Sequence, residues 1–234
     1  MKIANQVALV TGANRGLGRH FAQQLLERGA TKVYAAARRP ESIDLPGVEP
    51  IRLDITDPAS IEAAAARATD VTLLVNNAGI FTGSSLLTGD PADIRADLDT
   101  NFWGTLGMSR AFAPVLKANG GGAIANVLSA MSWFSAEGAN VYSVSKSAAW
   151  ALTNGLRLEL AAQHTRVAGI MLGVVDTEFS AWYDASPKGD PADVVRAALD
   201  GFEAGQVEIL ADEWSAYVKS TLAGDPRDFY TAVA

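Results

Sequence analysis

The stretch Val7-Ala8-Leu9-Val10-Thr11-Gly12-Ala13-Asn14-Arg15-Gly16-Leu17-Gly18 decides the fold of this 234-residue chain. It opens with a short apolar strand, and its glycines lead into a helix expected over residues 19–28. Glycine lets a backbone turn sharply and approach a pyrophosphate, and the N-terminus of the next helix offers free N–H groups to phosphates. This order of strand, turn and helix predicts a dinucleotide-binding α/β fold.

The same alternation of apolar strands and helices continues to the end of the chain. Strands are predicted at residues 31–37, 48–54, 71–76, 122–129, 166–172 and 206–210, and helices at 58–68, 92–119, 142–164, after Asp190-Pro191 and at the C-terminus. Such alternation is typical of a parallel sheet covered on both faces. We therefore predict an α/β protein, a doubly wound, seven-stranded parallel sheet flanked by helices (Rossmann-type), with a kink at Pro114 in the helix 92–119.

Composition excludes several classes of function. The net charge of −7 argues against a nucleic-acid binder, which needs a basic face. The chain has no cysteine and only two histidines, far apart, so no thiol chemistry and no metal site are expected. No apolar run approaches a membrane span, and the first polar turn comes too soon for a signal peptide. We expect a single dinucleotide-binding and catalytic domain over residues 1–234, located in the cytoplasm.

Tyr142 and Lys146 stand four residues apart in the run Val141-Tyr142-Ser143-Val144-Ser145-Lys146. On a helix, this spacing places both side chains on one face. A cation beside a phenol favours the phenolate, so we expect the pKa of Tyr142 to fall from about 10 toward neutrality. Ser129 ends an apolar run thirteen residues earlier. Together these residues suggest an acid–base device.

The choice between the two nicotinamide dinucleotides depends on the residue about 20 positions after the glycine turn. An aspartate or glutamate at this position hydrogen-bonds the free ribose 2′-OH of NAD, whereas an arginine binds the 2′-phosphate of NADP. Arg38 occupies this position, Arg39 follows, and no acid occurs between residues 33 and 40. Arg15 adds a cation within the turn. The pattern favours NADP over NAD, and the alternative is that Arg38 and Arg39 are solvated surface charges.

The motifs of this chain, and their order along it, resemble those of the short-chain dehydrogenases/reductases, in their compact single-domain branch. The resemblance covers residues 11–210. The resemblance is carried by the turn 11–18, Asp54-Ile55, Asn76-Asn77-Ala78-Gly79, Asn101-Phe102-Trp103-Gly104, the spacing of Ser129, Tyr142 and Lys146, and Val174-Val175-Asp176-Thr177. One departure is Leu172-Gly173, where the family usually has Pro-Gly. Loss of the proline ring is expected to leave this turn freer.

The resemblance implies a role for each matching residue. Tyr142 would be the general acid and base, Ser129 would hydrogen-bond the reacting oxygen, and Lys146 would tune Tyr142 and grip the nicotinamide ribose. Asn101 would hold a water that relays protons, unless neighbouring backbone simply satisfies its side chain. The implied cofactor-binding residues are Gly12, Asn14, Arg15, Gly16, Leu17, Gly18, Arg38, Asp54, Ile55, Asn77, Ala78, Gly79, Tyr142, Lys146, Val175 and Thr177, the last two holding the carboxamide.

These roles predict an NADP-dependent oxidoreductase that reversibly reduces a ketone or aldehyde to an alcohol. A group of aromatic residues indicates an apolar or aromatic substrate, unless half of them are core or subunit contacts: Phe81, Trp133, Phe134, Phe179, Trp182 and Tyr183. The segment 177–190 is interpreted as a substrate lid, short enough to leave the pocket open. The alternatives are a ketoreductase of carrier-bound 3-oxoacyl chains, which would need a basic patch, and a non-catalytic dinucleotide-sensing regulator, which would not need Tyr142.

The helices predicted over 92–119 and 143–164 carry more apolar residues than one core-facing stripe requires. These residues cannot all face the sheet of one subunit, and large exposed apolar patches usually mark association sites: Phe102, Trp103, Leu106, Phe112, Trp150, Leu152, Leu156 and Leu160. Members of the family that the chain resembles commonly pair these two helices across a two-fold axis. We expect a homodimer or a homotetramer, unless the residues pack under neighbouring loops.

Overall fold

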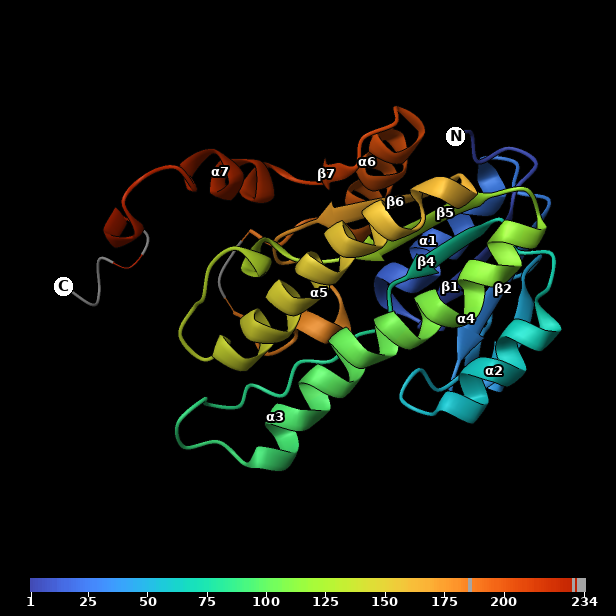
Figure 1. Ribbon diagram of the computed structural model, residues 1–234. Helices are drawn as coiled ribbons and strands as arrows, with labels where there is room; N and C mark the ends of the chain where they lie inside the picture. The colour runs from blue at the N-terminus through green and yellow to red at the C-terminus, as the bar shows by residue number, and fades with distance from the viewer. Residues whose placement is uncertain (185–186, 229, 231–234) are drawn as a thin grey trace.

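A seven-stranded parallel sheet forms the centre of the protein in the computed structural model, which describes residues 1–184, 187–228 and 230 (Figure 1). The strand order is β3-β2-β1-β4-β5-β6-β7. The strands are β1 (Val7–Thr11), β2 (Lys32–Ala37), β3 (Glu49–Arg52), β4 (Leu73–Asn76), β5 (Gly122–Val127), β6 (Thr165–Met171) and β7 (Glu208–Leu210). The predicted fold class is confirmed, and strand ends differ from prediction by at most two residues.

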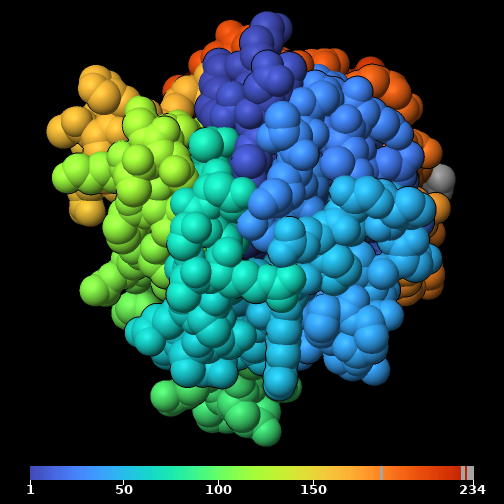
Figure 2. All heavy atoms as spheres, turned by 90° about the vertical axis from the view of Figure 1, so that its right-hand side faces the viewer, coloured from blue at the N-terminus to red at the C-terminus, as the bar shows by residue number. Residues whose placement is uncertain are grey.

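Helices cover both faces of the sheet, as the continuous apolar strands require. One face is packed by α1 (Gly16–Glu27) and α6 (Pro191–Glu203), and the other by α2 (Pro58–Arg67), α4 (Thr105–Ala118) and α5 (Asn140–Glu159). α3 (Pro91–Leu98) precedes α4, and α7 (Glu213–Thr221) lies beyond β7. Figure 2 shows that the N-terminal part of the chain, dark blue to cyan, covers much of one side of the molecule.

Aspartate caps define where most of these helices begin. The side chains of Asp57, Asp90 and Asp190 each accept a hydrogen bond from the N–H two residues on, and a proline follows each of them. The helix predicted to begin at Asp190-Pro191 is therefore confirmed. Asp212 caps α7 through a capping box, in which its side chain accepts from Ser215 N, three residues on. By contrast, α1 has neither a side-chain cap nor an acid in its first turn.

The expected helix 92–119 departs from regular geometry in a different place from the one predicted. α4 continues through Pro114, whereas the six residues Asp99–Gly104 form a π-helical segment, η2, between α3 and α4. A Cβ on Gly104 would lie 2.8 Å from Ile55 Cδ1, so the segment passes closely over the chain after β3. Single π turns are frequent at functional sites, and this one carries Asn101.

The other long helix is shorter than predicted. α5 ends at Glu159 rather than near His164, because a 3₁₀ turn follows and His164 takes the left-handed conformation with φ of 58°. At its start, α1 begins at Gly16, inside the turn that was expected to precede it. No helix in the described part of the chain is long and apolar enough to cross a membrane.

The apolar residues of α4, α5 and η2 divide between core and surface. Phe112, Leu156 and Leu160 lie in the core between the helices and the sheet. Trp103 is 57% exposed, and on α5 the exposed residues are Val144, at 44%, and Leu158, at 80%. The three buried residues are therefore not available to a partner, whereas the exposed ones are.

Candidate active site

A cavity of about 590 Å³ opens at the carboxyl ends of the strands. β1 pairs with both β2 and β4, so the strand order reverses there, and ligands of open α/β sheets bind at such a switch point. Its wall contains nearly all the predicted site residues: Gly12, Asn14, Arg15, Gly16, Leu17, Gly18, Arg38, Asp54, Ile55, Asn77, Ala78, Gly79, Ser129, Tyr142, Lys146, Val175 and Thr177. Asn101 lies behind the wall. The structure thus brings together residues predicted from seven separate segments.

The glycine turn is tightly packed against the chain after β4. Gly12 and Gly16 have φ of 65° and 51°, and a Cβ on Gly18 would lie 2.1 Å from Gly12 O. The Asn77 side chain donates to Thr11 O at 2.9 Å, and the Thr11 hydroxyl accepts from Asn77 N at 3.0 Å. These contacts hold the backbone where a bound phosphate would meet it.

Gly18→Ala should therefore destabilise the turn. The added methyl would meet backbone that cannot move cheaply, so we expect the free energy of unfolding to fall by about 1–3 kcal/mol. A matched control is Gly155→Ala in α5, where a Cβ has nothing within 4 Å. That change should be neutral or stabilising by up to about 1 kcal/mol. Chemical denaturation would measure both, and equal stabilities would contradict the packing argument.

The N-terminus of α1 faces the cavity without a capping side chain. Unlike α2, α3, α6 and α7, it offers uncapped N–H groups and a positive dipole end beside Gly16 and Leu17. This arrangement fits an anionic group such as a pyrophosphate. Arg15 and Arg38 are exposed in the cavity wall, and neither forms an ion pair with any described residue. Their guanidinium groups are therefore available to a second phosphate.

Asp54 and Ile55 lie at the same end of the cavity as Arg38. Burial raises the pKa of the Asp54 carboxyl, but hydrogen bonds from Thr56 and the charge of Arg38 outweigh it and leave that pKa lowered. Asp54 therefore carries a negative charge at neutral pH. Its Oδ1 already accepts from Thr56 N and Oγ1, which fixes its orientation.

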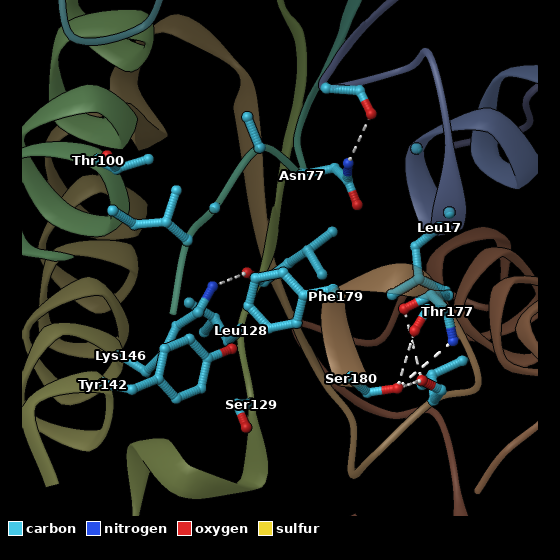
Figure 3. Close-up of a pocket in the computed structure, with 18 of the residues that line it drawn as sticks. Leu17, Asn77, Thr100, Leu128, Ser129, Tyr142, Lys146, Thr177, Phe179 and Ser180 are labelled. Atoms are coloured by element: carbon cyan, nitrogen blue, oxygen red, sulfur yellow. Dashed lines mark hydrogen bonds between the residues drawn. The ribbon is translucent and has the colours of Figure 1, made fainter. Parts of the chain in front are cut away.

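Tyr142 and Lys146 reach into the other half of the cavity from α5, opposite Thr177 and Leu17 (Figure 3). The Lys146 Nζ donates to Val127 O at 3.0 Å and lies 5.6 Å from the centre of the Tyr142 ring. Ser129 follows β5, and its side chain lies close enough to the Tyr142 phenol to lower the pKa of that phenol. Serine, tyrosine and lysine thus share one wall of the cavity.

The electrostatics of this trio differ from the expectation. Burial raises the pKa of Tyr142, the Asp97 carboxylate raises it further, and the nearby Ser129 side chain only partly offsets them. Burial also lowers the pKa of Lys146 to about 8. The predicted lowering of the Tyr142 pKa toward neutrality is therefore wrong for this structure, because loss of solvation outweighs the neighbouring cation. Tyr142 keeps its proton across the neutral range.

Asn101 braces three segments behind the cavity wall. Its Oδ1 accepts from Ile80 N at 3.0 Å, and its Nδ2 donates to Ile80 O at 3.0 Å and Ser145 Oγ at 2.9 Å. These bonds favour the alternative reading, in which neighbouring groups satisfy the side chain. The water-relay role of Asn101 stays a prediction.

Asp97 was missed at the level of the sequence. It is completely buried, accepts hydrogen bonds from Thr82 N and Oγ1, and lies 3.3 Å from Asn101 Nδ2. Its position four residues before Asn101 was a usable signal, because such residues share a helix face. Burial raises the pKa of this carboxyl, against the opposing effects of Thr82 and Lys146.

The aromatic residues separate into those that line the cavity and those that do not. Phe134, Phe179 and Trp182 line it, and Phe81 stacks on Trp182 at 4.3 Å between ring centres. Three predicted pocket residues, Phe81, Trp133 and Tyr183, are not in the wall. Sequence reasoning missed Trp214 of α7, for which no motif gives a signal.

The turn at Leu172 and Gly173, where the family usually has Pro-Gly, was expected to be freer, but hydrogen bonds to two other segments hold it in place. Leu172 O accepts from Ala130 N at 2.9 Å, and Gly173 N donates to Asp212 Oδ2 at 2.6 Å. A Cβ on Gly173 would lie 2.8 Å from Trp214 Cδ1, so the ring of Trp214 packs directly on this glycine. α7 therefore holds both the turn and the cavity wall beside it.

Comparison with known proteins identifies relatives over almost the whole chain. The family model for short chain dehydrogenases matches residues 6–187. A crystal structure of a short-chain dehydrogenase from Burkholderia cenocepacia in complex with NADP has 41% identity and a TM-score of 0.94, and covers 99% of this chain and 98% of that one. An NADP-dependent 3-hydroxy acid dehydrogenase of Schizosaccharomyces pombe is 30% identical, over 76% of this chain and 75% of its own. An uncharacterised oxidoreductase of Staphylococcus saprophyticus is 30% identical, over 85% and 92%.

Proposed function

Because the chain belongs to the short-chain dehydrogenase/reductase family, we propose that it is an NADP-dependent oxidoreductase that reversibly reduces a ketone or aldehyde to an alcohol. The observation that carries the proposal is the meeting of two features in one cavity. One end has an uncapped helix N-terminus with two arginines that form no ion pair with the described residues, and the other has Ser129, Tyr142 and Lys146.

NADP is the cofactor that fits the first end. The N-terminus of α1 and the glycine turn would hold the pyrophosphate, and Arg15 and Arg38 would hold the 2′-phosphate. Val175 and Thr177 would hold the carboxamide at the far end. The NADP in the Burkholderia cenocepacia structure and the NADP dependence of the Schizosaccharomyces pombe relative support this assignment.

The second end supplies proton transfer. The bound dinucleotide would supply the hydride for the carbonyl carbon. Tyr142 would donate its proton to the carbonyl oxygen, and its raised pKa keeps that proton available at neutral pH. Ser129 would hydrogen-bond the same oxygen as charge develops on it. Lys146, held by Val127 O, would present its positive charge beside both groups.

The substrate that fits this end best is an apolar or aromatic carbonyl compound. The wall there is formed by Met131, Phe134, Phe179, Trp182 and Trp214. Apart from Lys146, none of the described residues that line this end carries a cation, so neither the carboxylate of a 3-hydroxy acid nor an acidic carrier finds an ionic partner. Mostly apolar walls with a few polar groups are typical of small-molecule sites.

We also propose that the segment 177–190 covers the bound substrate. Within its described part, Trp182 stacks on Phe81, Lys188 Nζ donates to Ser180 O at 2.9 Å, and Val175 pairs with Gly189. Residues 185 and 186, which the predicted lid includes, lie outside the described residues.

The purified protein should oxidise NADPH when given aryl or alkyl ketones and aldehydes. We expect higher kcat/KM for apolar and aromatic compounds than for 3-oxo acids of similar size, because an unpaired carboxylate would be desolvated in an apolar pocket. Absorbance of NADPH would follow the reaction. Tight NADPH binding without turnover on any carbonyl compound would instead favour the dinucleotide-sensing regulator.

We propose a homodimer or homotetramer as the working form. The exposed Trp103 of η2 and the exposed Val144 and Leu158 of α5 support it. Light scattering should give a multiple of the monomer mass, and Leu158→Glu should shift the population toward monomer. The control Leu87→Glu, at a loop leucine that is 96% exposed, should leave the mass unchanged. A monomer mass for the wild type would contradict this assembly.

A further inference from the structure

A buried carboxylate lies behind the Tyr142–Lys146 pair without a direct ionic partner. Asp97, at the end of α3, is completely inaccessible and forms no ion pair with any described residue. An unpaired buried charge costs several kcal/mol unless hydrogen bonds satisfy it. Such a residue at the edge of an active site calls for a functional explanation.

Hydrogen bonds from two segments fix the Asp97 carboxylate. Its Oδ2 accepts from Thr82 N and Thr82 Oγ1, and its Oδ1 faces Asn101 Nδ2 at 3.3 Å. Asn101 in turn donates to Ser145 Oγ, and Ser145 is the neighbour of Lys146 in α5. The carboxylate is therefore held in one place relative to α5.

Asn101 and Gly79 link this carboxylate to the lysine through close contacts. A Cβ on Gly79 would lie 3.0 Å from Asn101 Oδ1 and 3.7 Å from Lys146 Nζ, so the three groups are in close succession. The Lys146 Nζ has one described hydrogen bond, to a neutral carbonyl, and no described carboxylate in contact. Asp97 is thus the nearby fixed charge of opposite sign for a buried ammonium.

We propose that Asp97 is a positioning residue of the active site, whose buried carboxylate, fixed by Thr82 and Asn101, acts electrostatically on Lys146 and Tyr142 of α5. This inference rests on the proposed function of Tyr142 and Lys146 and adds a member to their group. Asp97 touches neither cofactor nor substrate but acts through the field that it places on α5. At low local dielectric, such a field is little screened by salt.

The titratable groups around Asp97 agree with this role. Lys146 and Tyr142 face it from α5, and Asp93 lies one turn earlier on its own helix. The segment 80–84 contacts Asp97 through Thr82, and η2 contacts it through Asn101, both of which are neutral. The Asp97 carboxylate raises the pKa of Lys146 against burial and also raises the pKa of Tyr142. Neutralising it should lower both.

The first test is the pH dependence of NADPH affinity, which needs no turnover. In the wild type, affinity should fall as the pH rises through about 8, where Lys146 loses its charge. Asp97→Asn and Asp97→Ser should move this midpoint toward acid by about one pH unit, because removing a nearby opposite charge lowers the pKa of a cation. Asp97→Glu, which keeps the charge, and Asp93→Asn, at an exposed site on the same helix, should not move it.

The second test is the pH profile of kcat/KM in both directions. As the pH rises, kcat/KM for ketone reduction should fall and kcat/KM for alcohol oxidation should rise. In Asp97→Asn and Asp97→Ser, the midpoints of both changes should lie about one pH unit below those of the wild type, because both rates depend on the coupled titration of Tyr142 and Lys146. If Asp97 served only to hold Thr82 in place, its substitution would lower the rates without moving the midpoint of either pH profile. An unmoved midpoint, or failure of both neutral variants to fold, would overturn the proposal. If no carbonyl compound is reduced, the proposed function fails while NADPH affinity still tests Asp97.

Discussion

Tyr142→Phe should slow carbonyl reduction by about 10²–10⁴-fold while NADPH still binds. The substitution removes the phenol oxygen that we propose as proton donor but keeps the ring, which packs against Phe81 at 5.6 Å and Phe179 at 6.0 Å between ring centres. It touches neither the glycine turn nor the N-terminus of α1. The loss should therefore fall on kcat rather than on cofactor affinity.

The matched control for Tyr142→Phe is Tyr217→Phe. Tyr217 lies on α7, is 56% exposed and is not in the cavity wall. It should retain the wild-type rate. Steady-state kinetics would separate kcat from KM, and fluorescence titration would measure NADPH affinity. A Tyr142→Phe enzyme that keeps more than about a hundredth of the wild-type rate would contradict the general-acid role.

Arg38→Asp should reverse the cofactor preference from NADPH to NADH. Removing the charge-assisted hydrogen bonds to a 2′-phosphate, each worth about 1.5–3 kcal/mol, should lower kcat/KM for NADPH by at least about a hundredfold. The new carboxylate repels the 2′-phosphate and can accept a hydrogen bond from a free 2′-OH. Activity with NADH should rise as that with NADPH falls.

Arg39→Asp is the matched control, because Arg39 is the next residue but does not line the cavity. Its preference for NADPH should stay close to that of the wild type. Ratios of kcat/KM for the two cofactors would measure the effect in each variant. Equal use of NADH and NADPH by the wild type would show that Arg38 does not select the 2′-phosphate.

The sequence was sufficient for those parts of the fold and site that follow from local patterns. Continuous apolar strands and the turn at Gly12 and Gly18 determine the parallel sheet and the open end of α1. Side chains at the carboxyl ends of neighbouring parallel strands meet at one edge, so Asn77 and Ser129 could be brought together from order alone. Asp190 and Pro191 were enough to predict where α6 begins.

What could not be predicted depends on burial and on contacts between distant segments. The pKa of Tyr142 rises because the folded chain removes its solvent, which the spacing to Lys146 does not reveal. Trp214 lies in the cavity wall, and Asp212 beside it ties α7 to Gly173, 39 residues away. The π-helical segment around Asn101 packs closely on Ile55 through Gly104, a contact between distant segments that no local pattern indicates.

The most direct measurement is isotope transfer from NADPH that carries deuterium at both hydrogen positions of nicotinamide C4. The purified enzyme would be incubated with this cofactor and an aryl ketone, and the alcohol product would be examined by mass spectrometry. Hydride transfer in this cavity predicts one deuterium on the carbinol carbon for each NADPH consumed, and at least about a hundredfold less labelled alcohol when Tyr142→Phe replaces the wild type over the same time. NADPH bound without any labelled alcohol from the wild type would contradict the proposal.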